Sequence, residues 1–216
     1  SVDTRSALAD LRERSPRVSF GRGWVRDSVL ELFQEDIARY RALVVKDFTG
    51  DSMADLRSGK IPRLEALCLY NSTVYRWNRA CYGISQGKPH LRIENRVVPS
   101  GPTPTDEVAN AAFWFGLITA LSYRFDDISA VLEFEDASMN FTSAARLGLD
   151  AQFAWFNGEM LPATKLICDK LVPLARDGLV RRGIDEKDAD HYLGVIDERV
   201  SKYRTGACWQ VQSLAG

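Results

Sequence analysis

The segment from His90 to Arg96 constrains the fold of this chain most, because its residues alternate in the way that a β-strand requires. Leu91 and Ile93 alternate with larger polar residues, and side chains two positions apart lie on one face of a strand. The predicted polar face carries His90, Arg92, Glu94 and Arg96. A solvated strand face seldom needs two arginines beside an acid, so we expect a site that binds metal-bound phosphate.

A helix signal follows this strand almost at once. Thr103 is a suitable N-cap residue, Pro104 suits the first helical position, and Asp106 stands where a capping box places its acid. The helix that we expect from Pro104 to about Ser122 is apolar nearly all round, so it should be buried between other elements. Such a core helix would hold the strand in place.

Hydrophobic periodicity predicts the remaining elements. In chain order we expect helices over 3–13, 24–45 and 52–57, two strands within 67–77 around a turn at 71–72, a strand or buried turn over 151–156, and helices over 160–182 and 186–204. Short strands joined by short loops favour antiparallel pairing. The prediction is therefore an α+β fold, with residues 1–216 forming one helix-rich domain around a small antiparallel sheet.

Composition argues against several classes of function. The net charge of -1 gives no electrostatic footprint for nucleic acid or an anionic membrane, and no apolar run approaches the ~18 residues that span a bilayer. The chain has two histidines and four cysteines without a CxxC pair, so a zinc site is not predicted. We expect reduced thiols and a cytoplasmic protein.

Glu94 is the first candidate for chemistry. Mg²⁺ prefers one or two carboxylate oxygens together with substrate phosphates, so Glu94 is predicted to be the metal ligand. Arg96 lies on the same strand face and is predicted to be the catalytic residue that contacts a phosphate or a substrate carboxylate. His90 and Arg92 are predicted to help bind the substrate. The alternative is an ordinary Glu–Arg pair on a solvated sheet face.

A second candidate segment precedes this strand. Tyr75, Trp77 and Arg79 would share one strand face, and Arg76 and Asn78 the other. An arginine beside aromatic rings can clamp a substrate carboxylate while the rings exclude water. We therefore predict substrate-binding roles for both arginines and both aromatic residues. The alternative is a cation–π pair at the sheet edge, and the two arginines would serve one site only if a bulge intervened.

The remaining titratable residues are interpreted as structural. Asp126, Asp127, Glu133, Glu135 and Asp136 are interpreted as charges of loops and helix ends, and His191 as a surface residue. The sequence contains no glycine-rich phosphate loop and no nucleophile elbow. If ATP is used, acids and arginines on a sheet must hold it.

Three segments together resemble bacterial glutamate–cysteine ligase-like proteins. They are residues 69–79, residues 90–96 with 99–103, and residues 204–209. These proteins are carboxylate–amine ligases with a glutamine-synthetase-type active-site sheet, and one of their strands carries an E-x-R pattern that Glu94-Asn95-Arg96 matches. In the family this glutamate helps to bind the active-site metal, and the arginine contacts phosphate.

The resemblance implies ATP-dependent joining of the γ-carboxylate of glutamate to an amine such as cysteine, as in glutathione biosynthesis, through an acyl phosphate with Mg²⁺. The family takes further metal-binding acids from an N-terminal half, and no glutamate-rich strand precedes residue 60. We therefore expect the C-terminal part of such a ligase, inactive alone, with a missing N-terminal half or a homo-oligomer as partner. Two alternatives stay open: a non-catalytic domain that binds a small anion or regulates, and a structural module whose open sheet edge pairs with the missing half or a partner subunit.

Overall fold

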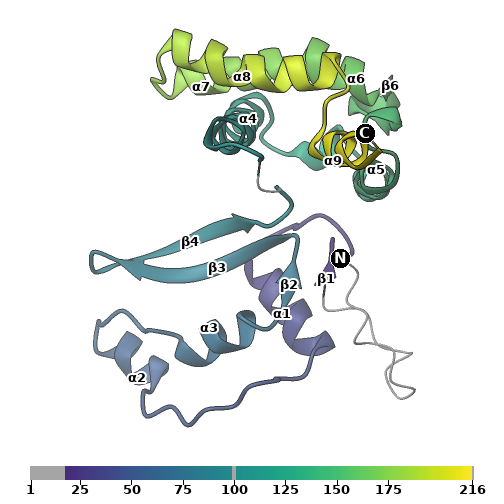
Figure 1. Ribbon diagram of the computed structural model, residues 1–216. Coiled ribbons are helices and arrows are strands. Elements are labelled where there is room, and N and C mark those ends of the chain that lie inside the picture. The colour runs from purple at the N-terminus through teal and green to yellow at the C-terminus, as the bar shows by residue number, and fades with distance from the viewer. Residues whose placement is uncertain (1–17, 99–100, 216) are drawn as a thin grey trace, which may run out of the picture. The chain divides into compact units, whose positions relative to one another are not determined.

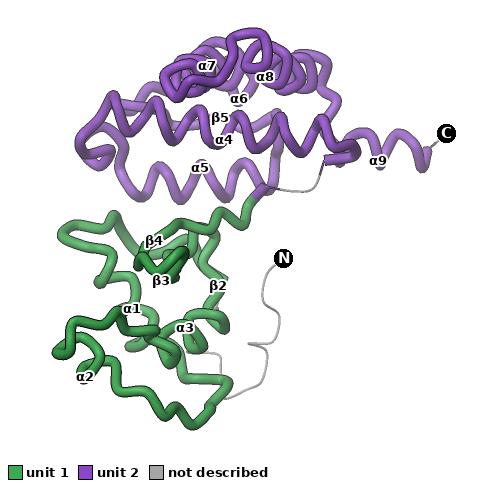
Figure 2. Tube along the Cα trace, turned by 90° about the vertical axis from the view of Figure 1, so that its left-hand side faces the viewer, with its two compact units in different colours: residues 1–97 green, residues 98–216 purple. Residues whose placement is uncertain are grey.

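The computed structural model describes residues 18–98 and 101–215 (Figure 1). The chain divides into two compact units, Ser1–Val97 and Val98–Gly216 (Figure 2). Both units combine helices with two-stranded sheets, which confirms the predicted α+β class. The single domain and the glutamine-synthetase-like arrangement stay predictions, and the helix expected over 3–13 lies outside the described residues.

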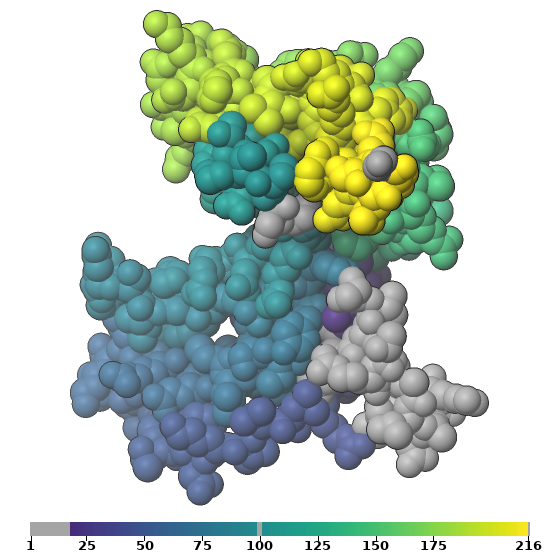
Figure 3. Space-filling model, in the orientation of Figure 1, coloured from purple at the N-terminus to yellow at the C-terminus, as the bar shows by residue number. Residues whose placement is uncertain are grey.

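The described part of unit 1, from residue 18 onward, contains a β-hairpin and three short helices. In chain order its elements are β1 (Val18–Ser19), α1 (Leu30–Arg39), α2 (Ser52–Arg57), α3 (Glu65–Asn71), β2 (Tyr75–Arg76), β3 (Asn78–Ser85) and β4 (Lys88–Asn95). β1 pairs in parallel with β2, and β3 pairs antiparallel with β4, as predicted for the central strands. Figure 3 shows the hairpin and the α2–α3 region as two layers of this unit with a hollow between them.

The helix predicted over 24–45 is much shorter in the structure, where α1 covers only Leu30–Arg39. Its start is set by the Glu31 carboxylate, which accepts hydrogen bonds from the backbone N–H groups of residues 26–28. At its end, Tyr40 has an extended backbone. The apolar residues Val44 and Val45 beyond it are 52% and 85% exposed, so their helical spacing reflects no buried helix face.

The prediction of a strand before residue 72 is wrong, because residues 65–71 form helix α3. The alternation of Leu67 and Leu69 is typical of a strand, but it also occurs within this helix. The residues that hold α3 in place are spaced by one helical turn: Asn71 donates from Nδ2 to the carbonyl of Ala80 at 2.8 Å, and the Cys68 thiol lies 3.9 Å from the carbonyl of Tyr82. A helix with these two contacts on one face covers the outer side of β3.

Unit 2 is mostly helical. In chain order its elements are α4 (Pro104–Arg124), η3 (Ile128–Ala130), α5 (Phe134–Leu147), η4 (Gly148–Asp150), β5 (Gln152–Ala154), η5 (Phe156–Gly158), β6 (Met160–Pro162), α6 (Ala163–Lys165), the π-helical η6 (Leu166–Leu171), α7 (Val172–Arg181), α8 (Glu186–Ser201) and α9 (Gly206–Ala215). The strand alternative for 151–156 is confirmed by β5. The predicted helix over 160–182 begins only at Ala163, because residues 160–162 form β6 and pair with β5.

Helix α4 begins as predicted and is the centre of this unit. The Thr103 hydroxyl accepts a hydrogen bond from the backbone N–H of Asp106, which caps the helix. α4 packs against α7 and α8, and the contact with α7 is close because a Cβ at Gly178 would overlap the carbonyl oxygen of Gly116. Arg199 of α8 donates to Asp106 at 2.8 Å and to Asn110 at 2.7 Å, which ties the two helices together at one end.

Complete burial of α4 was the wrong expectation. Its buried positions are Ala109, Gly116 and Ala120, whereas Phe115 is 62% and Ile118 42% exposed. Helices α7 and α8 pack on the small-residue face, and the bulky apolar residues lie on other faces. In the part of the chain that the structure describes, no helix has both the length and the apolar character needed to cross a membrane.

Candidate functional site

The candidate site lies on one face of the β3–β4 hairpin. The turn residues Gln86 and Gly87 both have positive φ angles, 49° and 72°, which is the geometry of the two-residue turn that matches the twist of a hairpin. This turn sets the register, in which Arg79 lies opposite Glu94 and Cys81 opposite Arg92. Side chains of these four positions share one face of the hairpin.

Glu94 is held by arginines on this face. Its Oε2 atom accepts from Arg79 Nε at 2.8 Å and from Arg79 Nη2, and Arg96 Nη1 lies 3.8 Å from the same oxygen. These hydrogen bonds from Arg79, followed by the nearby arginine charges, hold the pKa of Glu94 below its ordinary value despite partial desolvation. Within the described residues, the other oxygen, Oε1, forms no hydrogen bond.

The guanidinium of Arg92 also lies on this face of the hairpin, and its donors are the available ones. It makes no hydrogen bond or ion pair with any residue that the structure describes, and its side chain is exposed. Its guanidinium extends across Gly83 together with His90: a Cβ on Gly83 would lie 2.8 Å from Arg92 Nη1 and 2.9 Å from His90 Nε2. Glycine at this position therefore leaves room for both side chains on the hairpin face.

Beside this face lies a cavity of about 210 Å³. Its lining residues come from α1, α3, β3 and β4, together with Ser72 beyond the end of α3: Phe33, Leu67, Cys68, Asn71, Ser72, Arg79, Cys81, Tyr82 and Arg92. Two of them are arginines, and one of these, Arg92, has no hydrogen-bond or ion-pair partner in the described part of the chain. The volume suits a small molecule that presents an anionic group to the arginines.

The Cys68 thiol of the cavity is a poor candidate for a nucleophile. Burial raises the pKa of the Cys68 thiol above its ordinary value, and the neighbouring Cys81 adds to the effect, while Arg92 opposes it. A thiol reacts as its thiolate, so a raised pKa lowers reactivity at neutral pH. Cys68 therefore contributes shape to the cavity rather than covalent chemistry.

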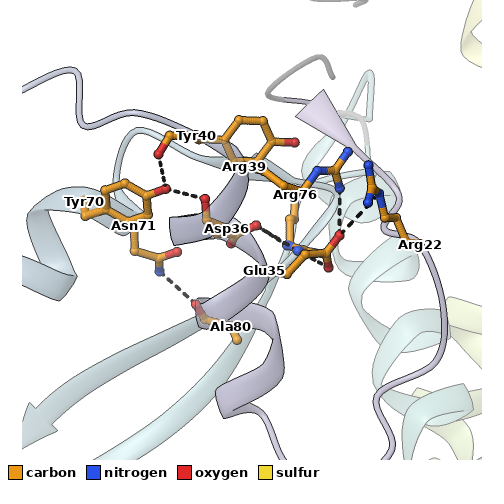
Figure 4. Close-up of polar contacts among 9 residues, drawn as sticks. All are labelled: Arg22, Glu35, Asp36, Arg39, Tyr40, Tyr70, Asn71, Arg76 and Ala80. Carbon is orange, nitrogen blue, oxygen red and sulfur yellow. Dashed lines mark hydrogen bonds and ion pairs between the residues drawn. The ribbon is translucent and has the colours of Figure 1, made fainter. Parts of the chain in front are cut away.

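Arg76 lies in a separate, buried cluster (Figure 4). Its side chain is 5% exposed and donates from Nε to Asp36 at 2.9 Å and from Nη2 to Glu35 at 2.7 Å. Arg39 also pairs with Glu35, at 2.7 Å, and the exposed Arg22 approaches it at 4.0 Å. Arg76 therefore anchors β2 to α1 through two carboxylates, and this geometry leaves no fork free for a substrate carboxylate.

The aromatic residues of the second candidate segment lie next to Arg96. The Arg96 guanidinium is 5.1 Å from the centre of the Tyr75 ring, a cation–π geometry. Trp77 accepts a backbone hydrogen bond from the N–H of Arg96 at 2.8 Å and donates its own N–H to the carbonyl of Ser19 at 3.2 Å. The side chains of segment 75–79 therefore lie in three places. Arg79 lies in the candidate site, Arg76 lies in the buried cluster, and Tyr75 packs against Arg96.

The metal prediction rests on Glu94 alone among the described residues. They contain no group of three or more His, Cys, Asp or Glu side chains that could hold a metal ion. Glu94 fits a single carboxylate ligand, because Oε1 is unbonded and the side chain is 43% exposed.

Of the acids interpreted as structural, Asp127 caps η3 through its side chain, and Glu133, Glu135 and Asp136 lie at the N-terminal end of α5.

Sequence reasoning missed several residues that shape the site. Cys68, Cys81 and Phe33 line the cavity, and Glu35 and Asp36 hold Arg76. The adjacent acids Glu35 and Asp36 on a helical face were the one available signal, because a Glu-Asp pair beside an apolar stripe is a candidate partner for a buried arginine.

Comparison of the chain with protein-family models, curated proteins and solved structures returned no match.

Proposed function

We propose that the Arg79–Arg92–Arg96 face of the hairpin binds the phosphate or carboxylate group of a small molecule. The observation that carries this proposal is the convergence of three arginines on a face with one carboxylate, where Arg92 donates to none of the residues that the structure describes. Arginine presents a planar fork of donors that matches carboxylate and phosphate oxygens. Glu94 neutralises only part of this charge, so an anion is the ligand that complements it.

The activity that we propose for this face is that of an ATP-dependent carboxylate–amine ligase resembling glutamate–cysteine ligase. In such a reaction Arg92 and Arg96 would bind and orient the anionic groups of ATP and glutamate. His90 beside Arg92 adds a further donor. Glu94 would hold Mg²⁺ through Oε1, and the ion, when bound, neutralises phosphate charge. Arg79 would keep Glu94 ionised and oriented.

A second candidate function is non-catalytic binding of a small anion, as in a regulatory domain. One observation favours it: Oε2 of Glu94 is already occupied by the fork of Arg79, so only one oxygen is free for a metal. Both candidates require an anion at Arg92 and differ in whether chemistry follows.

The test separates binding from turnover. Isothermal titration with ATP in Mg²⁺, inorganic phosphate and glutamate should give saturable binding that weakens about tenfold or more in Arg92→Met, because a charge-assisted fork is worth roughly 1.5–3 kcal/mol. Arg182→Met is the matched control, since it removes an exposed arginine elsewhere in the chain.

Turnover is measured as phosphate release and γ-glutamyl product from Mg²⁺-ATP, glutamate and cysteine, for this chain and for the complete gene product. Product that disappears in Glu94→Gln supports the ligase. Binding without product from the complete protein supports the regulatory function. Failure of every probe to bind contradicts both.

A further inference from the structure

The two edges of the β3–β4 hairpin differ in which backbone groups are free. The backbone N–H of Arg96 donates to the carbonyl of Trp77, in the direction of β3. Because the register is regular from Asn78 opposite Asn95 to Ser85 opposite Lys88, the even-numbered residues of β4 bond to β3 and the odd-numbered ones face outward. Pro89, which has no N–H, occupies an outward position, as a proline in an edge strand should.

Helix α3 covers the outer edge of β3, whereas no described helix or strand of unit 1 pairs with the outer edge of β4. The outward carbonyls of β3, at Ala80 and Tyr82, are the ones that Asn71 and Cys68 contact. On β4, the outward backbone groups of residues 91, 93 and 95 have no hydrogen-bond partner among the residues that the structure describes. The side chains there are also uncovered, with Leu91 55% and Ile93 65% exposed. An open, apolar edge is a template for pairing with another strand.

We propose that a second copy of this chain pairs with this edge, β4 antiparallel to the partner's β4 and centred on Ile93. In this register Ile93 lies opposite the partner's Ile93, and Leu91 opposite the partner's Asn95. All of these are outward positions, so about six backbone hydrogen bonds form without disturbing the hairpin. The product is a four-stranded sheet, which is more stable than the isolated two-stranded hairpin.

Charge selects this register over its neighbours. It places Arg92 opposite the partner's Glu94 and Glu94 opposite the partner's Arg92, in the close, non-hydrogen-bonded type of pair. A shift by two residues in one direction would set Arg92 against the partner's Arg92, and a shift in the other direction would set Glu94 against the partner's Glu94. Like charges directly opposite are destabilising.

The first test is the concentration dependence of association. The strand interface is small, below roughly 1,200 Å², so a weak dimer with a micromolar Kd is expected in sedimentation velocity. Ile93→Pro removes an outward N–H and keeps the hairpin's own bonds, and it should weaken dimerisation at least tenfold. Ile93→Thr keeps the N–H and is the matched control. A chain that stays monomeric to about 200 µM, or an Ile93→Pro variant that associates like the parent, overturns the proposal.

The second test uses the charges and does not depend on the first variant. Arg92→Glu alone sets two acids against each other across the interface, and Glu94→Arg alone sets two arginines against each other, so each variant should be monomeric. An equimolar mixture restores both opposite-charge pairs and should form heterodimers that native mass spectrometry resolves. A mixture that associates no better than its components contradicts the register. The proposal does not rest on the proposed function, since association is measured without ligand.

Discussion

Replacement of the buried Arg76 by methionine tests whether this residue anchors the fold or binds a substrate. The change leaves the Asp36 carboxylate, whose side chain is 5% exposed, without its arginine partner, while Glu35 keeps Arg39. Removal of one member of a buried ion pair typically costs about 3–5 kcal/mol because the other charge stays buried and uncompensated. With a urea m-value of about 2 kcal/mol/M, the unfolding midpoint of unit 1 should fall by roughly 1.5–2.5 M.

The measurement is a urea titration followed by hydrogen–deuterium exchange over α1 and β2, which assigns the transition to unit 1. Arg22→Ala is the matched control, because it removes a 68% exposed arginine that approaches the same Glu35 at 4.0 Å. An exposed pair of this kind contributes at most about 1 kcal/mol. A second substitution, Asp36→Asn, should recover part of the stability lost in Arg76→Met, since it removes the stranded charge.

The pH dependence of the variant gives an independent check. Burial raises the pKa of Asp36 above its ordinary value of 3.8, although Arg76 opposes this effect. Without Arg76 the folded-state pKa rises further, so the folded state binds the proton more tightly than the unfolded state does. The loss of stability in Arg76→Met should therefore be small at low pH and grow as the pH rises above 3.8. A loss below about 1 kcal/mol at pH 7, equal to that of Arg22→Ala, would refute the anchoring role.

Three further predictions concern unit 2. Gly178→Ala should destabilise it by about 1–3 kcal/mol, because the new methyl group overlaps the carbonyl of Gly116. The control, Gly194→Ala, lies at an open position of α8 and should stabilise unit 2 by up to about 1 kcal/mol. Equal changes in melting temperature for the two variants would contradict the close α4–α7 contact. Asn140→Ala removes two hydrogen bonds, at 2.6 and 2.9 Å, to the backbone of Ala154 and should cost about 1–3 kcal/mol in chemical denaturation, unlike the exposed Thr142→Ala. The Thr103 hydroxyl, followed by Arg199, lowers the pKa of Asp106 from its ordinary 3.8. The stabilisation by its carboxylate is therefore present above that pH and is lost as the pH falls through the lower folded-state pKa. The melting temperatures of Asp106→Asn and the parent should differ at pH 7 and converge as the pH is lowered below 3.8, and a constant difference would contradict this.

Local signals in the sequence predicted the elements that depend on neighbouring residues. The cap at Thr103 and the proline at the first helical position located the start of α4, and alternation located β4. The predicted polar row on β4 is present as a face that carries His90, Arg92 and Glu94. In each case the interactions that decide the structure span only a few residues.

Contacts between distant residues decided the elements and partners that the sequence did not reveal. Arg76 binds acids that precede it by about forty residues, and no local pattern specifies which of several arginines becomes buried. Helix α3 is fixed by contacts of Cys68 and Asn71 with a strand that follows it, which overrode the alternation of leucines. The pairing of Glu94 with Arg79 likewise follows from the hairpin register rather than from the spacing within β4.

The most direct test of the anion site is a titration of the ¹⁵N-labelled arginine side chains with inorganic phosphate. Arg92 donates to no residue in the described ranges 18–98 and 101–215, Arg79 is bonded to Glu94, and Arg76 is buried between two acids. The account predicts that the Nε resonance of Arg92 shifts most and saturably, that Arg79 shifts less, and that Arg76 does not move. Spectra in which Arg92 stays unchanged, or in which all exposed arginines shift alike without saturation, would contradict it.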